Sequence, residues 1–238
     1  MTYCVGLLLD AGMVLLSDTR TNAGIDNIST YRKMFTFEDP GERVVAIMTA
    51  GSLSTTQTTI ARLEEAIEEG GPRSIMSAPT MLGVAEIVGD TLTEVSGKVA
   101  DKLGDRAQSA RASMIVAGQR RGGDPRMFLV YSEGNFIEAT GDTPFLQIGE
   151  HKYGKPILDR VVRPSTSLAD AQKAALLSMD STLRSNLSVG MPLDLTVIES
   201  NTCSIARTRR IEAEDETFQA MSAAWSAALR DSFATIEI

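Results

Sequence analysis

The chain has 238 residues, 43% hydrophobic and 23% charged, so it can bury an apolar core without disulfide bonds or metal ions. Its formal net charge of −8 argues against nucleic acid or an anionic membrane as the main partner, and its aromatic content of 5% argues against binding bases by stacking. Two distant cysteines, Cys4 and Cys203, and a single histidine, His151, argue against a disulfide framework and a zinc site. These features predict a cytoplasmic protein that needs no metal or other cofactor.

The first fifty residues are predicted to form four consecutive antiparallel strands. β-Prone apolar segments are separated by turn residues, at Asp10–Gly12 in the first hairpin and at Asp39–Gly41 in the second. The apolar start, Met1–Leu16, is interpreted as a strand and not as a signal or membrane segment, because no basic residues precede it and the first turn interrupts it. Residues 21–29 are polar and loop-like. The predicted strands are Thr2–Leu9, Met13–Arg20, Tyr31–Glu38 and Arg43–Ala50.

After residue 51 the hydrophobic period changes to that of helices. Helices are predicted at Ser52–Glu69, Pro79–Leu103, Leu168–Leu187 and Glu216–Ser232, with further strands at Ala112–Ala117, Arg126–Tyr131, Phe136–Thr140, Leu193–Glu199 and Cys203–Arg209. This order lacks strict βα alternation, which disfavours a parallel doubly wound sheet. Strands such as Val44–Met48 are apolar on both faces, which indicates two stacked sheets with helices on their outer sides. No linker or repeat divides the sequence, so residues 1–238 are expected to form one domain.

Two charged residues fall on apolar faces of the predicted strands. Lys33 shares a face with Phe35 and Phe37. Asp18 shares a face with Leu16. An isolated buried charge is costly, so each residue needs a partner. Either the two pair with each other inside the sheet, or Lys33 extends to solvent and Asp18 opens a turn, and the pattern leaves both alternatives open.

Thr2 adds the third element of a possible reaction centre. Removal of Met1, which is usual before such a small residue, would give Thr2 a free α-amine with a pKa of about 7.7–8.0, able to act as a base near neutral pH. A nearby lysine ammonium would lower that pKa, and a carboxylate would hold the lysine charged. Gly51, where a strand changes to a helix, offers a backbone N–H to an oxyanion. Thr2, Lys33 and Asp18 on adjacent strands would thus form an acyl-transfer apparatus.

Several short segments, spread over nearly the whole chain, carry a family signature. They are Thr2-Tyr3-Cys4-Val5-Gly6, Ser17-Asp18-Thr19-Arg20, Tyr31-Arg32-Lys33, Ala50-Gly51-Ser52, Ile148-Gly149-Glu150 with Tyr153–Leu158, and Leu183–Gly190. In these segments the sequence resembles the proteasome β-type subunits of the N-terminal-nucleophile hydrolases, and most closely the bacterial proteasome homologues called Anbu. The resemblance implies an α+β fold, a four-layer α/β/β/α sandwich of two antiparallel sheets, and self-association into rings or open spirals.

The resemblance also implies roles for individual residues. Thr2 would be the nucleophile with its own amine as the base, Asp18 and Lys33 the supporting pair, Gly51 the oxyanion donor, and Ser188 the serine that hydrogen-bonds near the amine. The positions that bind an extended peptide or unfolded-protein substrate would be Thr21, Asn22 and Gly51, and Thr49 lies in the strand that shapes the side-chain pocket.

Two positions depart from the proteasome pattern. Ser185 stands where an aspartate is usual and Glu150 where a serine is usual, and both are expected near the Thr2 amine. No long propeptide is expected before Thr2. Two functions remain open: a threonine-type peptidase that acts as a subunit of a self-compartmentalised oligomer, and a catalytically idle assembly subunit.

Two other motifs offer competing interpretations. Residues 149–155 have the spacing of a phosphate-binding loop, and Phe145–Ile148 before them could be a strand. Pro156, however, stands where that motif needs Ser or Thr. Cys4 and His151 are a conceivable thiol dyad, although a cysteine within an apolar strand is usually a small buried side chain.

Overall fold

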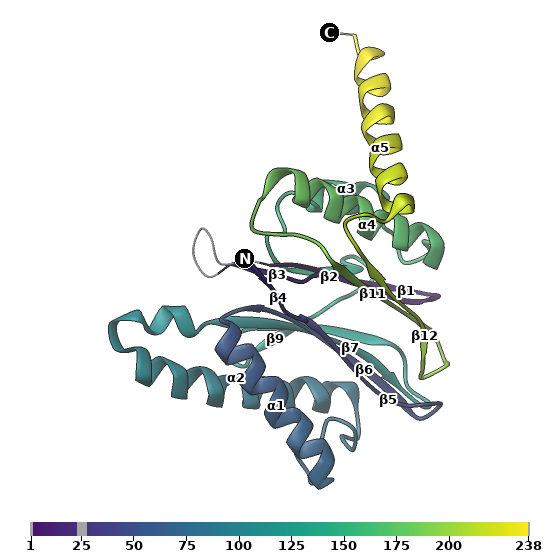
Figure 1. Ribbon diagram of the computed structural model, residues 1–238. Helices are drawn as coiled ribbons and strands as arrows, with labels where there is room; N and C mark the ends of the chain where they lie inside the picture. The colour runs from purple at the N-terminus through teal and green to yellow at the C-terminus, as the bar shows by residue number, and fades with distance from the viewer. Residues whose placement is uncertain (1, 23–27, 238) are drawn as a thin grey trace.

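Two antiparallel sheets of five strands each lie face to face at the centre of the molecule, and helices cover the outer face of each sheet (Figure 1). The computed structural model describes residues 2–22 and 28–237. The order of layers is helix, sheet, sheet, helix. This confirms the predicted α+β class and the four-layer α/β/β/α sandwich.

The first sheet contains the N-terminal hairpin at its centre. Its strand order is β10-β1-β2-β11-β12, and all neighbouring strands are antiparallel. The helices α3 (Lys155–Val161) and α4 (Leu168–Ser185) lie over its outer face, whereas α5 (Glu216–Ala234) projects away from the body (Figure 1). The strands are β1 (Tyr3–Leu9), β2 (Gly12–Asp18), β10 (Phe145–Gly149), β11 (Leu193–Glu199) and β12 (Ile205–Ile211).

The second sheet follows the chain order β5-β6-β7-β8-β9 and is covered by α1 (Leu53–Glu69) and α2 (Met81–Leu103). The 3₁₀ helix η1 (Gly104–Ala110) leads from α2 back into the sheet. Two short strands, β3 (Arg20–Asn22) and β4 (Ile28–Thr30), pair separately. The five strands are β5 (Met34–Asp39), β6 (Arg43–Gly51), β7 (Ala112–Arg120), β8 (Arg126–Val130) and β9 (Phe136–Glu138).

Apolar side chains fill all three spaces between the layers. The layer between the sheets includes Cys4, Met13 and Leu15 from the first sheet and Met48 and Ile115 from the second. Two further clusters fill the spaces between each sheet and its helices. Because complete burial of one such aliphatic side chain stabilises the fold by about 1.5–3 kcal/mol, strands with both faces apolar are favoured here. This packing explains the uninterrupted apolar runs in β1, β2 and β6.

Short polar residues fix where the long helices begin. The side chains of Ser52, Thr80, Ser167 and Asp215 each accept a hydrogen bond from the backbone N–H three residues later, at the starts of α1, α2, α4 and α5. Gly70 ends α1 in the left-handed conformation, at a φ of 65°. The predicted helices therefore agree with the structure to within a few residues, whereas α3 and η1 were not predicted, because seven residues give too few periodic positions.

Two predictions in the N-terminal part are wrong. β5 begins at Met34 and not at Tyr31, and the segment predicted as a loop contains β3 at one end and β4 at the other. The Tyr31 N–H donates to Thr19 O at 2.9 Å, so the chain still follows the β3–β4 hairpin at this point. Lys33 therefore lies between strands, and its side chain is not confined to the face that holds the two phenylalanines of β5.

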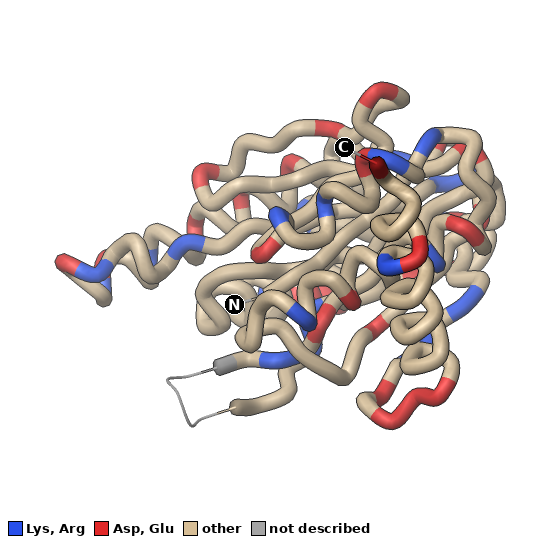
Figure 2. Tube along the Cα trace, turned by 90° about the horizontal axis from the view of Figure 1, so that it is seen from above, with Lys and Arg blue, Asp and Glu red and all other residues tan. Residues whose placement is uncertain are grey.

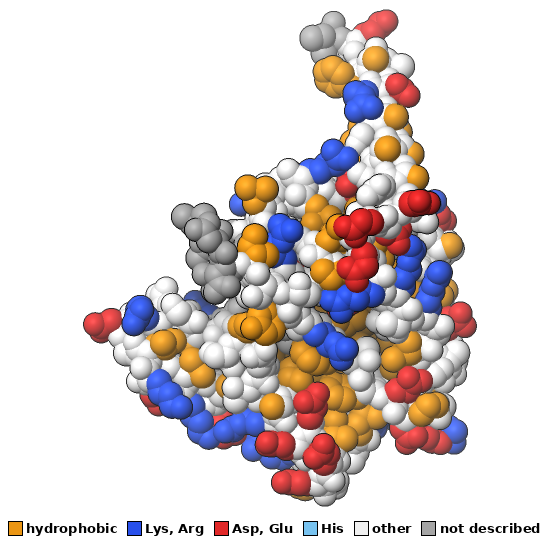
Figure 3. Space-filling view, viewed as in Figure 1, with side chains coloured by type: hydrophobic (Ala, Val, Ile, Leu, Met, Phe, Trp, Pro, Cys, Tyr) orange, Lys and Arg blue, Asp and Glu red, His pale blue; other side chains and the backbone are white. Residues whose placement is uncertain are grey.

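The surface combines mixed charge with one projecting apolar element. Lysine, arginine and acidic residues are interspersed along the chain (Figure 2), and hydrophobic side chains continue along α5 (Figure 3). Phe233 near the end of α5 is 79% exposed, and Leu229 and Ile236 are exposed as well. None of the described helices has both the length and the apolar composition needed to cross a bilayer. α5 thus presents apolar side chains that the rest of the described chain leaves uncovered.

Candidate active site

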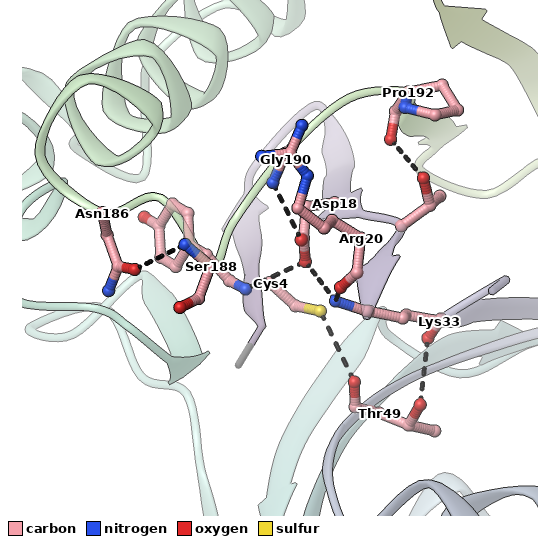
Figure 4. A network of polar contacts seen from close by, with 11 residues as sticks. Cys4, Asp18, Arg20, Lys33, Thr49, Asn186, Ser188, Gly190 and Pro192 are labelled. Carbon is pink, nitrogen blue, oxygen red and sulfur yellow. Dashed lines mark hydrogen bonds and ion pairs between the residues drawn. The ribbon is translucent and has the colours of Figure 1, made fainter. Parts of the chain in front are cut away.

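A buried ion pair links the end of β2 in the first sheet to the residue just before β5 in the second (Figure 4). The Lys33 Nζ lies 2.8 Å from Asp18 Oδ1, and only 5% of Lys33 and none of Asp18 is exposed to solvent. The structure therefore confirms the predicted pairing and excludes the solvent-exposed lysine. The strand alternation, however, had placed Lys33 on the same face as Phe35 and Phe37. These two pack against the helix-side cluster, whereas Lys33 pairs with the other sheet, so that prediction is wrong.

Backbone groups also form hydrogen bonds with both members of this pair. The Tyr3 N–H donates to Asp18 Oδ1 at 3.0 Å, and the Gly190 N–H donates to Oδ2 at 3.3 Å. The Lys33 Nζ also donates to the Arg20 carbonyl oxygen at 2.6 Å. Burial raises the pKa of the Asp18 carboxyl above its ordinary value, and the Lys33 ammonium and the two amides oppose that rise. The site thus holds a carboxylate in a buried position through three donors, one of them charged.

Hydrogen bonds on both sides of the Thr2–Tyr3 peptide bond hold Thr2 beside the ion pair. The Glu150 N–H donates to the Thr2 carbonyl oxygen at 2.7 Å, and the next peptide nitrogen, that of Tyr3, shares Asp18 Oδ1 with Lys33. Gly149 packs so closely that a Cβ there would lie 1.9 Å from the Thr2 oxygen, and its φ is +81°. Only glycine permits this approach. These contacts fix the backbone of Thr2 next to the lysine–aspartate pair. Only 8% of the Thr2 residue is exposed to solvent.

The backbone N–H of Gly51 lies at the end of β6, just before α1 begins. Ser52 donates to Arg111 O on one side of β6, and Thr49 donates to Lys33 O on the other, each at 2.9 Å. Because N–H groups alternate sides along an antiparallel strand, the Gly51 N–H points to the same side as that of Thr49. The pairing of β6 with β5 begins only opposite Met48, so this N–H lies beyond its end. A donor at a helix N-terminus in such a position suits a developing oxyanion.

Thr49, near the end of β6, contacts both the Lys33 backbone and Cys4 of β1. Its Oγ1 donates to Lys33 O at 3.5 Å, and its own carbonyl oxygen accepts from the Cys4 thiol at 3.7 Å (Figure 4). Thr49 is therefore buried between β1 and the Lys33 backbone. Thr21 lies in the middle of β3, half-buried and opposite Ser29 of β4.

Some predicted residues lie partly or wholly outside the described part of the chain. Asn22 ends β3, but its side chain is not described, and Met1 lies outside the described residues altogether. Their assigned roles in substrate binding and in unmasking Thr2 stay predictions.

The three remaining predicted residues lie on the segments that flank the site. Ser188 is half-buried in the loop after α4, where its N–H donates to Asn186 Oδ1 at 2.9 Å (Figure 4). Ser185 is the exposed last residue of α4, and Glu150 is half-buried. Glu150 reaches Thr2 through its backbone N–H, while its side chain and that of Ser185 form no hydrogen bond or ion pair with any described residue. Their effect on the Thr2 amine stays a prediction.

Sequence reasoning did not single out two residues that the structure brings to the site. Arg20 supplies a carbonyl to Lys33, and Gly190 supplies an amide to Asp18. Both lie in segments that carry the family signature, yet neither residue type signals such a contact by itself. The Gly190 contact depends on the approach of the loop after α4 to the end of β2, and the Arg20 contact depends on the approach of β3 to the residue just before β5.

The competing interpretations are not supported by the geometry. Cys4 is fully buried and directs its thiol at Thr49 O, whereas His151 is exposed and its Nδ1 lies 3.1 Å from Gly149 O. Burial raises the pKa of the Cys4 thiol well above its ordinary range. The thiol dyad is therefore wrong. Lys155 of the phosphate-loop pattern pairs with Asp159 at 2.6 Å. Among the described residues no group of three or more His, Cys, Asp or Glu is arranged to hold a metal ion.

Comparison with known proteins places this geometry in a family. The proteasome subunit family matches residues 2–198, and no protein with a curated description matches the chain. The chain is similar in structure to Anbu (ancestral β-subunit) from Yersinia bercovieri, with a TM-score of 0.92, 40% identity and coverage of 99% of this chain and 98% of that chain. It is similar to Anbu from Hyphomicrobium sp., with a TM-score of 0.88, 47% identity and coverage of 99% and 98%. A helical assembly of the Anbu complex from Pseudomonas aeruginosa matches with a TM-score of 0.93, 44% identity and coverage of 99% and 97%. The chain therefore belongs to the proteasome subunit family and, within it, to the Anbu-type proteins.

Proposed function

We propose that the chain is a threonine-type peptidase, in which Thr2, exposed by removal of Met1, hydrolyses amide bonds of peptides or unfolded proteins. The observation that carries this proposal is the buried Lys33–Asp18 pair, which shares an oxygen with the peptide nitrogen next to Thr2. A buried ion pair is weak support for stability, since two hydrophobic residues would serve as well. Its position beside a threonine favours a chemical role.

The reaction follows from the groups assembled around Thr2. The neutral α-amine of Thr2 takes the proton from its Oγ as that oxygen bonds to the substrate carbonyl carbon. The Lys33 ammonium lowers the pKa of the amine and stabilises the developing alkoxide, while Asp18 keeps the lysine charged and in place. The Gly51 N–H receives the oxyanion. Collapse breaks the C–N bond, and the leaving amine takes the proton from the Thr2 ammonium.

Water completes the cycle at the resulting Thr2 ester. The amine again accepts a proton, this time from water, as the hydroxyl oxygen bonds to the ester carbon. The C–Oγ bond then breaks, and the Thr2 oxygen recovers its proton. Ser188 would hold the amine, and Ser185 and Glu150 would tune it. Backbone groups of Thr21, Asn22 and Gly51 would pair with the substrate as a strand, and Thr49 would line the side-chain pocket.

We further propose that the chain acts as a subunit of a ring or spiral homo-oligomer in the cytoplasm, with residues 1–238 as one domain. The projecting α5 supports self-association, because Leu229 and Phe233 of this helix, and Ile236 just after it, leave apolar surface exposed. The Pseudomonas aeruginosa relative forms a helical assembly. The common apolar layer between the sheets supports a single domain.

A second function, a catalytically idle assembly subunit, is favoured by one observation. Ser185 replaces the aspartate that proteasome subunits usually carry, and its exposed side chain makes no polar contact with any described residue. An idle subunit would keep the fold and the self-association but not the reaction.

Intact-mass measurement of the assembled protein, before and after treatment with a peptide epoxyketone, separates the two functions. This probe needs both the hydroxyl and the free amine of an N-terminal threonine. For the peptidase we expect loss of the mass of Met1 and then addition of one probe molecule. The Thr2→Ala variant should not react, and Thr2→Ser should. Retention of Met1, or no reaction after its removal, would establish the idle subunit.

A further inference from the structure

The guanidinium of Arg20 occupies the space that a side chain would take at Gly190 (Figure 4). A Cβ on Gly190 would lie 2.1 Å from Arg20 Nε and 2.2 Å from Cζ. Arg20 also donates from its NH1 nitrogen to the Leu187 carbonyl oxygen at 3.1 Å. The side chain of Arg20 is thus packed against the loop after α4 at two points, and only the absence of a side chain at Gly190 allows it.

The same loop and the same arginine both contact the ion pair. Gly190 donates its N–H to Asp18 Oδ2 at 3.3 Å, and the Arg20 carbonyl oxygen accepts from Lys33 Nζ at 2.6 Å. Ser188 lies between the two points at which Arg20 contacts the loop. A change in the Arg20 side chain would therefore act on the loop, and the loop would act on Asp18 and Ser188.

Stability alone does not account for this contact. The Nε of Arg20 is buried and has no hydrogen-bond partner among the described residues. A buried donor without a partner is unfavourable for folding, so an arginine retained purely for stability would be expected to pair this nitrogen. A positioning role explains why the guanidinium is placed against the loop despite that cost.

We propose that Arg20 is a positioning residue for the reaction: its guanidinium, seated against Gly190, holds residues 187–190, so that Asp18 keeps its second amide donor and Ser188 keeps its place in this loop. The proposal rests on the proposed peptidase function. Arg20 acts through Asp18 and Ser188 and does not itself touch the reacting atoms.

Three variants and one control test this role. Arg20→Ala removes the guanidinium, Arg20→Lys keeps the charge without the planar group, and Gly190→Ala displaces the guanidinium without removing it. Arg106→Ala removes an exposed arginine far along the chain, on η1, and serves as the control. If Gly190→Ala fails to fold, the two Arg20 variants carry the test.

The first measurement is the rate of epoxyketone labelling of the assembled protein as a function of pH. We expect each variant to label about tenfold to a hundredfold more slowly, the effect of a small misplacement of reacting groups. Loss of the Gly190 amide disfavours the carboxylate form of Asp18, so the acid limb of the profile should move to higher pH. Among the described side chains, those of Lys33 and Cys4 interact electrostatically with the Asp18 carboxyl, and the variants leave both unchanged. The double variant Arg20→Ala/Gly190→Ala should be no slower than the slower single variant.

The second measurement is hydrogen exchange of residues 187–190 by mass spectrometry, which does not require activity. We expect faster exchange in Arg20→Ala than in Arg106→Ala. If the wild type labels but the variants keep its rate and its pH profile, the positioning role is overturned. If the wild type does not label, the peptidase function fails, and the exchange result alone decides whether Arg20 holds the loop.

Discussion

The Lys33→Ala substitution tests the centre of the proposed mechanism. It removes the ammonium and leaves the Asp18 carboxyl fully buried, with the amides of Tyr3 and Gly190 as its remaining donors among the described residues. Loss of one partner from a buried ion pair costs about 3–5 kcal/mol, because the remaining charge is not compensated. We also expect loss of epoxyketone labelling, since the proposed mechanism relies on this ammonium to lower the pKa of the Thr2 amine.

The stability cost should depend on pH in a defined direction. Burial already raises the pKa of Asp18, and removal of the ammonium raises it further. A group whose pKa is higher in the folded than in the unfolded chain contributes stability at low pH and loses it as the pH rises through the folded value. The difference in unfolding free energy between wild type and Lys33→Ala should therefore be smaller at pH 5 than at pH 8.

Urea unfolding at both pH values measures this difference. The protein concentration must be equal in all samples, because self-association stabilises the folded chain by mass action. The double variant Asp18→Asn/Lys33→Met removes both charges and should recover most of the stability but none of the labelling. Labelling of Lys33→Ala at the wild-type rate would refute the role given to this lysine, and equal stability at both pH values would refute the energetic argument.

Three further predictions concern the surroundings of the site and the surface. Gly149→Ala places a Cβ against the Thr2 carbonyl oxygen at a φ of +81°, so it should lose about 1–3 kcal/mol of stability and most labelling, measured by urea unfolding and intact mass. Gly141→Ala, with open space around it, is the matched control and should behave as wild type. Phe233→Asp should lower the oligomer mass in sedimentation without changing the circular dichroism spectrum, and an unchanged mass would argue against α5 as a contact. Tyr3→Phe removes the two side-chain hydrogen bonds of a buried phenol and should cost about 1–3 kcal/mol. Because burial raises the pKa of Tyr3 to about 12, this cost should be the same at pH 7 and pH 9, and a change between them would contradict a neutral phenol.

Local patterns in the sequence were sufficient to predict the layers of the fold. Runs apolar on both faces predicted stacked sheets, and β6 is buried on both faces between the other sheet and α1. A charged residue in an apolar segment needs a partner or access to solvent, so the pairing of Asp18 with Lys33 could be named in advance as one of two alternatives, and the structure decided between them. Both inferences depend on burial, which the composition of a segment encodes.

The arrangement of the site was decided by the tertiary structure. Strand alternation predicted the wrong side for Lys33, because β5 begins only at Met34, so Lys33 precedes the strand and its side chain crosses to Asp18 in the other sheet. No pattern indicated that the missing side chain of Gly190 makes room for Arg20, or that Gly149 lets its chain approach Thr2. These contacts join residues that are distant in sequence. They depend on how sheets and loops stack at close range, and that is set by the packing of the whole chain.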